Sequence, residues 1–164
     1  MALKDGLLTD FDHEMGTTRR LLDRLPDDKF SWKPHEKSMT LGALATHLAN
    51  IPYWGDIILN HSSIDLATIP PGRDAMTSRA AVLADFDEKV RRTRALLDQT
   101  DAQLSALWTL KRSGQEVFTA PRVAAFRSFV LHHIIHHRGQ LSVYLRLNDV
   151  PVPAIYGPTA DEGG

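Results

Sequence analysis

Residues 123–148 read VAAFRSFVLHHIIHHRGQLSVYLRLN, and this segment is the most informative one for the architecture. Apolar residues recur in it at the spacing of one face of an α-helix: Val123, Phe126, Val130, Ile134, Leu141 and Leu145. Pro121 is well placed to open this helix, because proline is tolerated at the first helical position. The segment therefore predicts a long helix that runs from Pro121 to Asn148.

The same helical period occurs in three earlier segments, residues 3–25, 41–58 and 78–97. Pro26 ends the first segment, and the hydroxyl side chains of Ser38, Thr40 and Ser78 are available to cap the second and third. Pro52 lies inside the second segment and should kink it, because proline lacks the backbone N–H that a continuous helix requires.

Long connections separate these helices. Residues 61–77 contain Pro70-Pro71-Gly72 and no apolar period, which indicates a crossover or a surface loop. Residues 107–118 place two apolar runs on either side of Lys111-Arg112-Ser113-Gly114, a pattern typical of a short hairpin or of an extended loop. The four helices predict an all-α fold, a four-helix bundle with long crossover connections, formed by a single domain over residues 1–164.

The chain of 164 residues carries 19 Lys and Arg against 20 Asp and Glu, and it has no cysteine. A net charge of −1 gives no long-range field that would attract nucleic acid or anionic lipid, so we expect neither as a partner. The absence of cysteine excludes disulfides, iron–sulfur clusters and cysteine-ligated zinc. No apolar run has the roughly 18–20 residues that cross a bilayer, and no signal peptide is visible, so we expect a cytoplasmic protein.

Half of the eight histidines lie in the six residues from His132 to His137. Residues four apart share a helix face, so His132 with His136, or His133 with His137, can hold one metal ion between them. From the centre of the apolar stripe, His137 lies about 30° away and His133 about 70°, whereas His136 and His132 lie about 130° and 170° away. We therefore expect His133 and His137 to face the core.

His47 is a third inward imidazole, because it lies between Leu44 and Leu48 on the apolar side of the second helical segment. Three neutral imidazoles from two helices suit a divalent transition metal, with the remaining positions open to water or substrate. The alternative is that each imidazole is a neutral core side chain, hydrogen-bonded to a neighbour. No carboxylate lies in the cluster, so a carboxylate-bridged di-iron centre is not expected.

Four further side chains are candidates for the pocket or for a shell around the metal: Glu14, Trp54, His136 and Tyr144. Glu14 is the one acid near an inward position of the first helix, which makes it a candidate general base. His136 and Glu14 are also the candidates for a fourth ligand in a closed site. Arg138 lies toward the edge of the apolar stripe. A surface salt bridge, a dimer contact and substrate binding are all possible roles for it. The other histidines, expected at the surface, are His13, His35 and His61.

Three segments carry a family resemblance. LGALATHLA at residues 41–49 contains His47, HIIHHRGQL at residues 133–141 contains His133 and His137, and VPVPAIYGP forms the tail at residues 150–158. With Tyr144-Leu145-Arg146 after the second segment, they resemble the DinB/YfiT-like superfamily of metal-dependent proteins. The resemblance implies that His47, His133 and His137 are a metal triad in a four-helix bundle with long crossovers. It also implies a homodimer, since dimers are common in the superfamily.

The resemblance extends to a class of chemistry. Characterised relatives are thiol-dependent transferases and isomerases that use bacillithiol, mycothiol or glutathione, which implies a small-molecule substrate and a low-molecular-weight thiol. Our preferred hypothesis is a metal-dependent thiol S-transferase that acts on electrophilic small molecules, with Zn²⁺ or Ni²⁺ in the triad lowering the pKa of a bound thiol. Two alternatives stay open: a metal-dependent hydrolase that uses water in place of the thiol, and a non-catalytic, stress-induced protein that binds a metal or a small ligand. A di-metal oxidase is disfavoured by the missing acids.

Overall fold

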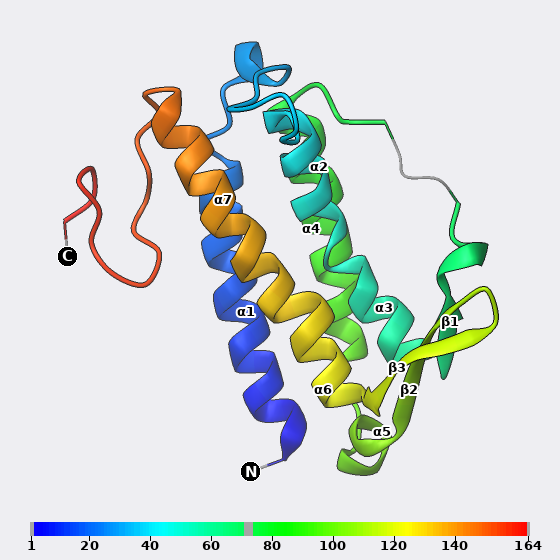
Figure 1. The fold of residues 1–164 in the computed structure, drawn as a ribbon. Helices are drawn as coiled ribbons and strands as arrows, with labels where there is room; N and C mark the ends of the chain where they lie inside the picture. The colour runs from blue at the N-terminus through cyan, green and yellow to red at the C-terminus, as the bar shows by residue number, and fades with distance from the viewer. Residues whose placement is uncertain (1, 71–73, 164) are drawn as a thin grey trace.

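The computed structural model describes residues 2–70 and 74–163, and it is mostly helical (Figure 1). Helix α1 (Leu3–Leu22) is followed by α2 (Leu41–Asn50) and its continuation α3 (Tyr53–Asn60), and then by α4 (Arg79–Leu96). The last long helical segment consists of α6 (Arg122–Phe126), a π-helical segment (Arg127–His132) and α7 (His133–Leu147). The remaining helical turns are short: Asp27–Lys29, Leu66–Thr68 and α5 (Asp101–Ser105).

Helix boundaries follow the caps and breakers of the sequence. The Thr40 hydroxyl accepts a hydrogen bond from the Ala43 N–H at 3.1 Å where α2 begins, and Ser78 caps α4 in the same way through Ala81 at 3.2 Å. Pro52 lies between α2 and α3, as predicted for a residue without a backbone N–H. The buried Thr93 hydroxyl donates to the Pro52 carbonyl at 2.7 Å and satisfies an acceptor at this break.

The long helices enclose one apolar core. Helix α1 packs against α4 and α7, α2 packs against the same two helices, and α3 packs against α4 and α6. Side chains such as Phe11, Leu48, Phe86 and Leu141 are fully buried or nearly so between them. Within the part of the chain that the structure describes, none of the helices combines the length and the apolar character that crossing a lipid bilayer requires.

The all-α prediction is wrong in one respect, because a three-stranded sheet lies beside the helices (Figure 1). Strands β2 (Leu107–Arg112) and β3 (Gln115–Pro121) form a hairpin, which is one of the two structures predicted for this segment. Ser113 and Gly114 have positive φ in its turn. Strand β1 (Ser63–Asp65), inside the connection expected to be a crossover or surface loop, pairs in parallel with β2. The Asp65 carboxylate accepts from the Ser113 and Gly114 N–H groups at 2.9 and 2.6 Å and holds the turn to β1.

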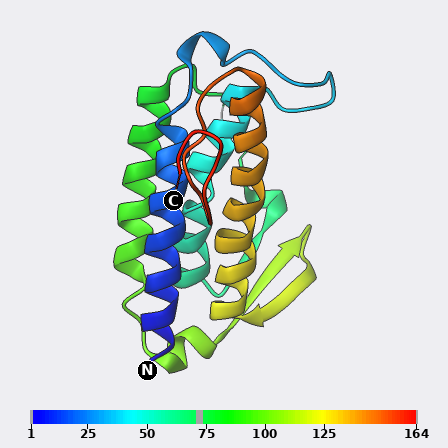
Figure 2. The same ribbon diagram turned by 90° about the vertical axis from the view of Figure 1, so that its left-hand side faces the viewer.

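The C-terminal tail, residues 149–163, folds back over α1 and α7 (Figure 2). Glu162 pairs with Arg24, just after the end of α1, at 3.1 Å, and Asp161 pairs with Arg146 of α7. Arg20 also donates to the Ala154 carbonyl at 2.5 Å. The tail therefore joins α1 to α7 through contacts that are remote in sequence.

Candidate metal centre

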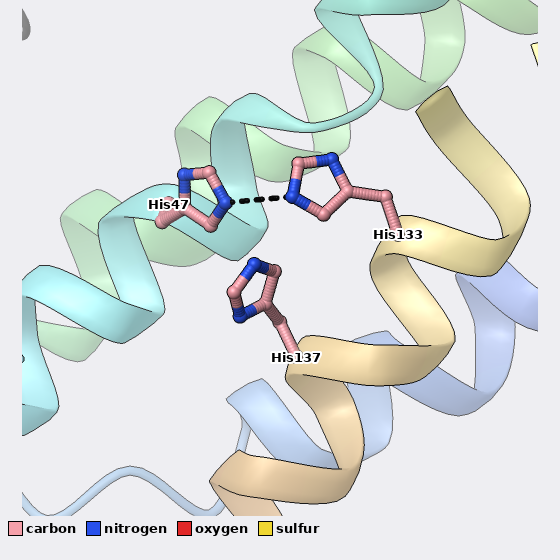
Figure 3. A group of neighbouring side chains, drawn as sticks. All are labelled: His47, His133 and His137. Atoms are coloured by element: carbon pink, nitrogen blue, oxygen red, sulfur yellow. Dashed lines mark hydrogen bonds between the residues drawn. The ribbon is translucent and has the colours of Figure 1, made fainter. Parts of the chain in front are cut away.

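Three histidines from two helices converge on one point between α2 and α7 (Figure 3). His47 lies in the last turn of α2, while His133 is the first residue of α7 and His137 follows one turn later. The four-residue spacing places His133 and His137 on one helix face, and α2 brings His47 opposite them. All three side chains are half-buried.

The ring nitrogens are close enough to share an ion. His47 Nε2 lies 3.1 Å from His133 Nε2, and ligand atoms from all three residues lie within 4.8 Å of one another. Two nitrogens bound to a tetrahedral zinc at 2.0–2.1 Å are about 3.3 Å apart, so the His47–His133 separation suits two ligands of one ion. The ring centroid of His137 is 4.4 Å from that of His47 and 4.8 Å from that of His133.

Electrostatics keep these imidazoles neutral. Burial lowers the pKa of His47 from 6.5 to about 4, and the neighbouring His137 and His133 add to this shift. Burial is also the main cause of the lowered pKa values of His133 and His137. A neutral imidazole is the form that binds a metal, so the donor set fits a divalent ion.

Gln140 fixes the orientation of one ring, a role that the sequence did not reveal. Its Oε1 lies 2.7 Å from His137 Nδ1. In the tautomer whose Nδ1–H donates to this oxygen, the lone pair of His137 is on Nε2. Ring orientation by a hydrogen bond on the far nitrogen is the usual arrangement around a metal-ligating histidine, and the i, i+3 spacing of the two residues is its only sequence signal.

Arg138 is buried in the structure, although a surface position was one of the possibilities for it. The buried residues of α7 are Ile134, Leu141 and Leu145 of the predicted apolar stripe together with Arg138, and both histidines lie on one side of this face. Of the roles left open for Arg138, a surface salt bridge is therefore wrong, because its ion pair with Glu14 is buried.

Glu14 is buried but lies apart from the histidines. Its carboxylate pairs with Arg138 at 2.6 Å and accepts a hydrogen bond from the Tyr156 hydroxyl at 2.8 Å. Burial, followed by this hydrogen bond, raises the pKa of Tyr156. Glu14 is absent from the group of side chains that can share an ion, so its position does not support a role as metal ligand or general base.

The other three candidates make contacts of different kinds. The Trp54 ring stacks on Phe129 with centroids 5.9 Å apart, and the Tyr144 hydroxyl donates to the Met39 carbonyl at 3.2 Å. His136 is exposed, and its ring centroid lies 4.8 Å from that of His137. His13, His35 and His61 are exposed, as expected.

A pocket of about 730 Å³ adjoins the triad at His47. One wall consists of polar side chains on α2 and α3, and another of charged side chains on α4, where Arg92 pairs with Asp56 of α3 at 2.7 Å. Ile69, Pro70 and Met76 supply apolar surface from the connection before α4. These walls come from separate parts of the chain, so no sequence motif indicates the pocket.

Fold and site together define a mostly helical protein with a candidate three-histidine metal centre. The chain belongs to the DinB superfamily, whose family model matches residues 10–141. It is 28% identical over 162 residues to the uncharacterized protein YrdA of Bacillus subtilis (strain 168), with 96% of this chain and 90% of YrdA covered.

Two solved structures share the fold. A DinB-like protein from Bacillus cereus ATCC 10987 matches with a TM-score of 0.70 and 23% identity, covering 93% of this chain and 97% of that one. A second DinB-like protein, YjoA of Bacillus subtilis, matches with a TM-score of 0.70 and 21% identity, covering 92% and 97%. Both likenesses extend over almost the whole chain.

Proposed function

We propose that this protein is a metal-dependent enzyme that transfers a low-molecular-weight thiol to an electrophilic small molecule. The observation that carries the proposal is the convergence of His47, His133 and His137, whose ligand atoms lie within 4.8 Å of one another. Zn²⁺ or Ni²⁺ is the proposed ion, because both accept neutral imidazole ligands. Such an ion, when bound, lowers the pKa of a thiol or water that it ligates.

The open character of the donor set supports catalysis over a structural role. A closed tetrahedral site needs a fourth protein ligand, and among residues 2–70 and 74–163 no further His, Cys, Asp or Glu joins the three histidines. Glu14 is held by Arg138 and Tyr156, and His136 is exposed. A site with three protein ligands leaves room for a substrate atom.

The pocket beside His47 supports a small-molecule substrate. Its volume of about 730 Å³ lies in the range of ordinary ligand sites. Apolar side chains such as Ile69 and Met76 offer contact to a hydrophobic electrophile, and the amide of Asn50 and the hydroxyl of Tyr53 offer hydrogen bonds. In the proposed reaction the thiol sulfur bonds to the electrophilic carbon, the leaving group departs with its electron pair, and the thiol proton passes to solvent.

Hydrolysis by the same centre is the competing reaction, since water fits wherever a thiol sulfur fits. Thiol transfer and hydrolysis differ in whether the thiol is consumed. A transferase loses one free thiol for each leaving group released, whereas a hydrolase releases the leaving group in the absence of thiol.

The test combines metal analysis with a thiol assay. After dialysis that removes weakly held metal, untagged protein is expected to contain one Zn²⁺ or Ni²⁺ per chain, His47→Ala to contain none, and the exposed-site control His61→Ala to match the wild type. With 1-chloro-2,4-dinitrobenzene and a panel of thiols, metal-loaded wild type should consume thiol and His47→Ala should not. A wild type that neither contains nor takes up more metal than His47→Ala would overturn the proposal, and leaving-group release without thiol would replace it with hydrolysis.

A further inference from the structure

The triad uses one of the two histidine pairs of the last long helical segment and leaves the other unexplained. His132, the last residue of the π-helical segment, and His136 of α7 are also four residues apart, and both side chains are exposed. Their backbone supports this pairing, because His132 (φ −66°, ψ −35°) and His133 (φ −66°, ψ −44°) are both α-helical. Residues four apart on an α-helix have Cβ atoms about 5–6 Å apart, on the same face.

The nitrogens of this pair are free to bind. Within the described part of the chain, no hydrogen bond or ion pair involves either ring, and the one ring contact is that of His136 with His137 at 4.8 Å. Gly139, one turn after His136, adds no side chain to this face, and a Cβ built there meets nothing within 4 Å. The face is therefore open to an ion from solvent.

We propose that His132 and His136 form a second, solvent-facing site for a divalent transition metal. Two neutral imidazoles at i and i+4 chelate one ion, as in helical zinc motifs, and water completes the coordination. Affinity for nitrogen ligands rises from Zn²⁺ and Ni²⁺ to Cu²⁺, so the pair takes Cu²⁺ most tightly. With two protein ligands against three, it holds Ni²⁺ or Zn²⁺ more weakly than the triad does. The site does not depend on the function proposed for the triad.

The test is equilibrium dialysis of metal-free protein against Ni²⁺, above the ordinary imidazole pKa of about 6.5. The wild type should bind one more Ni²⁺ per chain than His132→Ala/His136→Ala, and each single variant should lose the same ion because chelation needs both rings. The matched control is His35→Ala/His61→Ala, which also removes two exposed histidines but no pair at chelating spacing. This control should bind as much Ni²⁺ as the wild type.

A second measurement locates the ion. Paramagnetic Cu²⁺, added to protein whose triad is already filled with Zn²⁺, should broaden the imidazole NMR signals of His132 and His136 before those of His35 and His61. Equal Ni²⁺ binding by the wild type and His132→Ala/His136→Ala would overturn the proposal. If the triad holds no metal, the wild type binds a single Ni²⁺ that is lost in His132→Ala/His136→Ala and kept in His47→Ala, so failure of the triad is distinguishable from failure of the pair.

Discussion

Arg138 Nη2 lies 2.6 Å from Glu14 Oε2, and this ion pair joins α7 to α1 inside the protein. Arg138 is only 1% exposed. Its second terminal nitrogen donates to the Glu14 carbonyl at 3.1 Å and to the Thr18 hydroxyl at 3.3 Å, and the guanidinium lies 5.0 Å from the Tyr156 ring centroid. Because Arg138 directly follows His137, these contacts also fix the rotation of α7 that presents the triad to α2.

Removal of the arginine should be strongly destabilising. In Arg138→Met the Glu14 carboxylate stays buried without its cation, which typically costs about 3–5 kcal/mol. The free energy of unfolding of Arg138→Met, measured by chemical denaturation of metal-free protein, is expected to fall by that amount.

Two variants separate this effect from a general sensitivity to charge removal. Glu14→Leu/Arg138→Met removes both charges and should lie closer to the wild type than Arg138→Met does. Asp87→Asn breaks the Arg19–Asp87 pair, whose side chains are 48% and 45% exposed, and should cost less than about 1 kcal/mol. Equal losses in Arg138→Met and Asp87→Asn would contradict the assignment.

Local patterns in the sequence were sufficient for the parts of the fold that depend on neighbouring residues. The apolar period located the long helices, Pro52 located the break between α2 and α3, and the spacing of His133 and His137 indicated the face that meets His47. Each of these depends on residues within one or two helical turns.

Parts of the fold that depend on contacts between residues distant in sequence were not predicted from the sequence. Strand β1 has three residues and forms because β2, more than forty residues later, pairs with it. The burial of Arg138 depends on Glu14 and Thr18, which are more than a hundred positions away. Without those partners a charged residue on a helix is expected at the surface, so the burial of Arg138 could not be predicted from the sequence.

Gln140 should tune the affinity of the triad for metal. It orients His137 through the 2.7 Å contact with Nδ1, and loss of such a partner typically weakens metal binding roughly 10–100-fold. Gln140→Ala is expected to raise the Kd for Zn²⁺ by this factor, measured by competition with a chromophoric chelator.

Two further variants test whether the effect is specific to the hydrogen bond. Gln140→Glu keeps an acceptor oxygen for the Nδ1–H and should restore most of the affinity. Gln115→Ala, at an exposed position of β3, should leave the Kd unchanged. An unaltered Kd in Gln140→Ala would show that His137 needs no orienting partner.

The stability of metal-free protein should depend on pH through His47. The folded protein holds this imidazole at a pKa of about 4, against 6.5 ordinarily, so between these values the unfolded chain binds a proton that the folded chain does not. The free energy of unfolding should therefore fall as the pH falls from about 6.5 to about 4, and His47 should contribute no slope above 6.5. Denaturation of chelator-treated protein across this range gives the slope.

His47→Ala provides the comparison for this slope. The variant lacks the imidazole that resists protonation, so its stability should fall less steeply with decreasing pH. His133 and His137 have pKa values shifted in the same direction, so a shallower slope remains. Identical slopes in wild type and His47→Ala would show that His47 titrates normally in the folded protein.

Replacement of Gly55, where α3 packs against α4 and α6, should destabilise the protein. A Cβ at this position would lie 2.8 Å from Phe126 Cε2 and closer still to Thr93 Cγ2, and both of those side chains are fully buried. Thr93 cannot rotate away without losing the hydrogen bond from its hydroxyl to the Pro52 carbonyl. Gly55→Ala is therefore expected to lower the free energy of unfolding by about 1–3 kcal/mol, the usual cost of overpacking.

A second glycine provides the matched control for this effect. Gly16 lies in α1, where an added Cβ meets nothing within 4 Å, so Gly16→Ala should raise the free energy of unfolding by roughly 0.5–1 kcal/mol through helix propensity alone. Thermal denaturation of the two variants should move the midpoint in opposite directions. A midpoint for Gly55→Ala at or above that of the wild type would mean that α3 can move away from Thr93 and Phe126, and that the helices beside the triad are less tightly packed than the structure indicates.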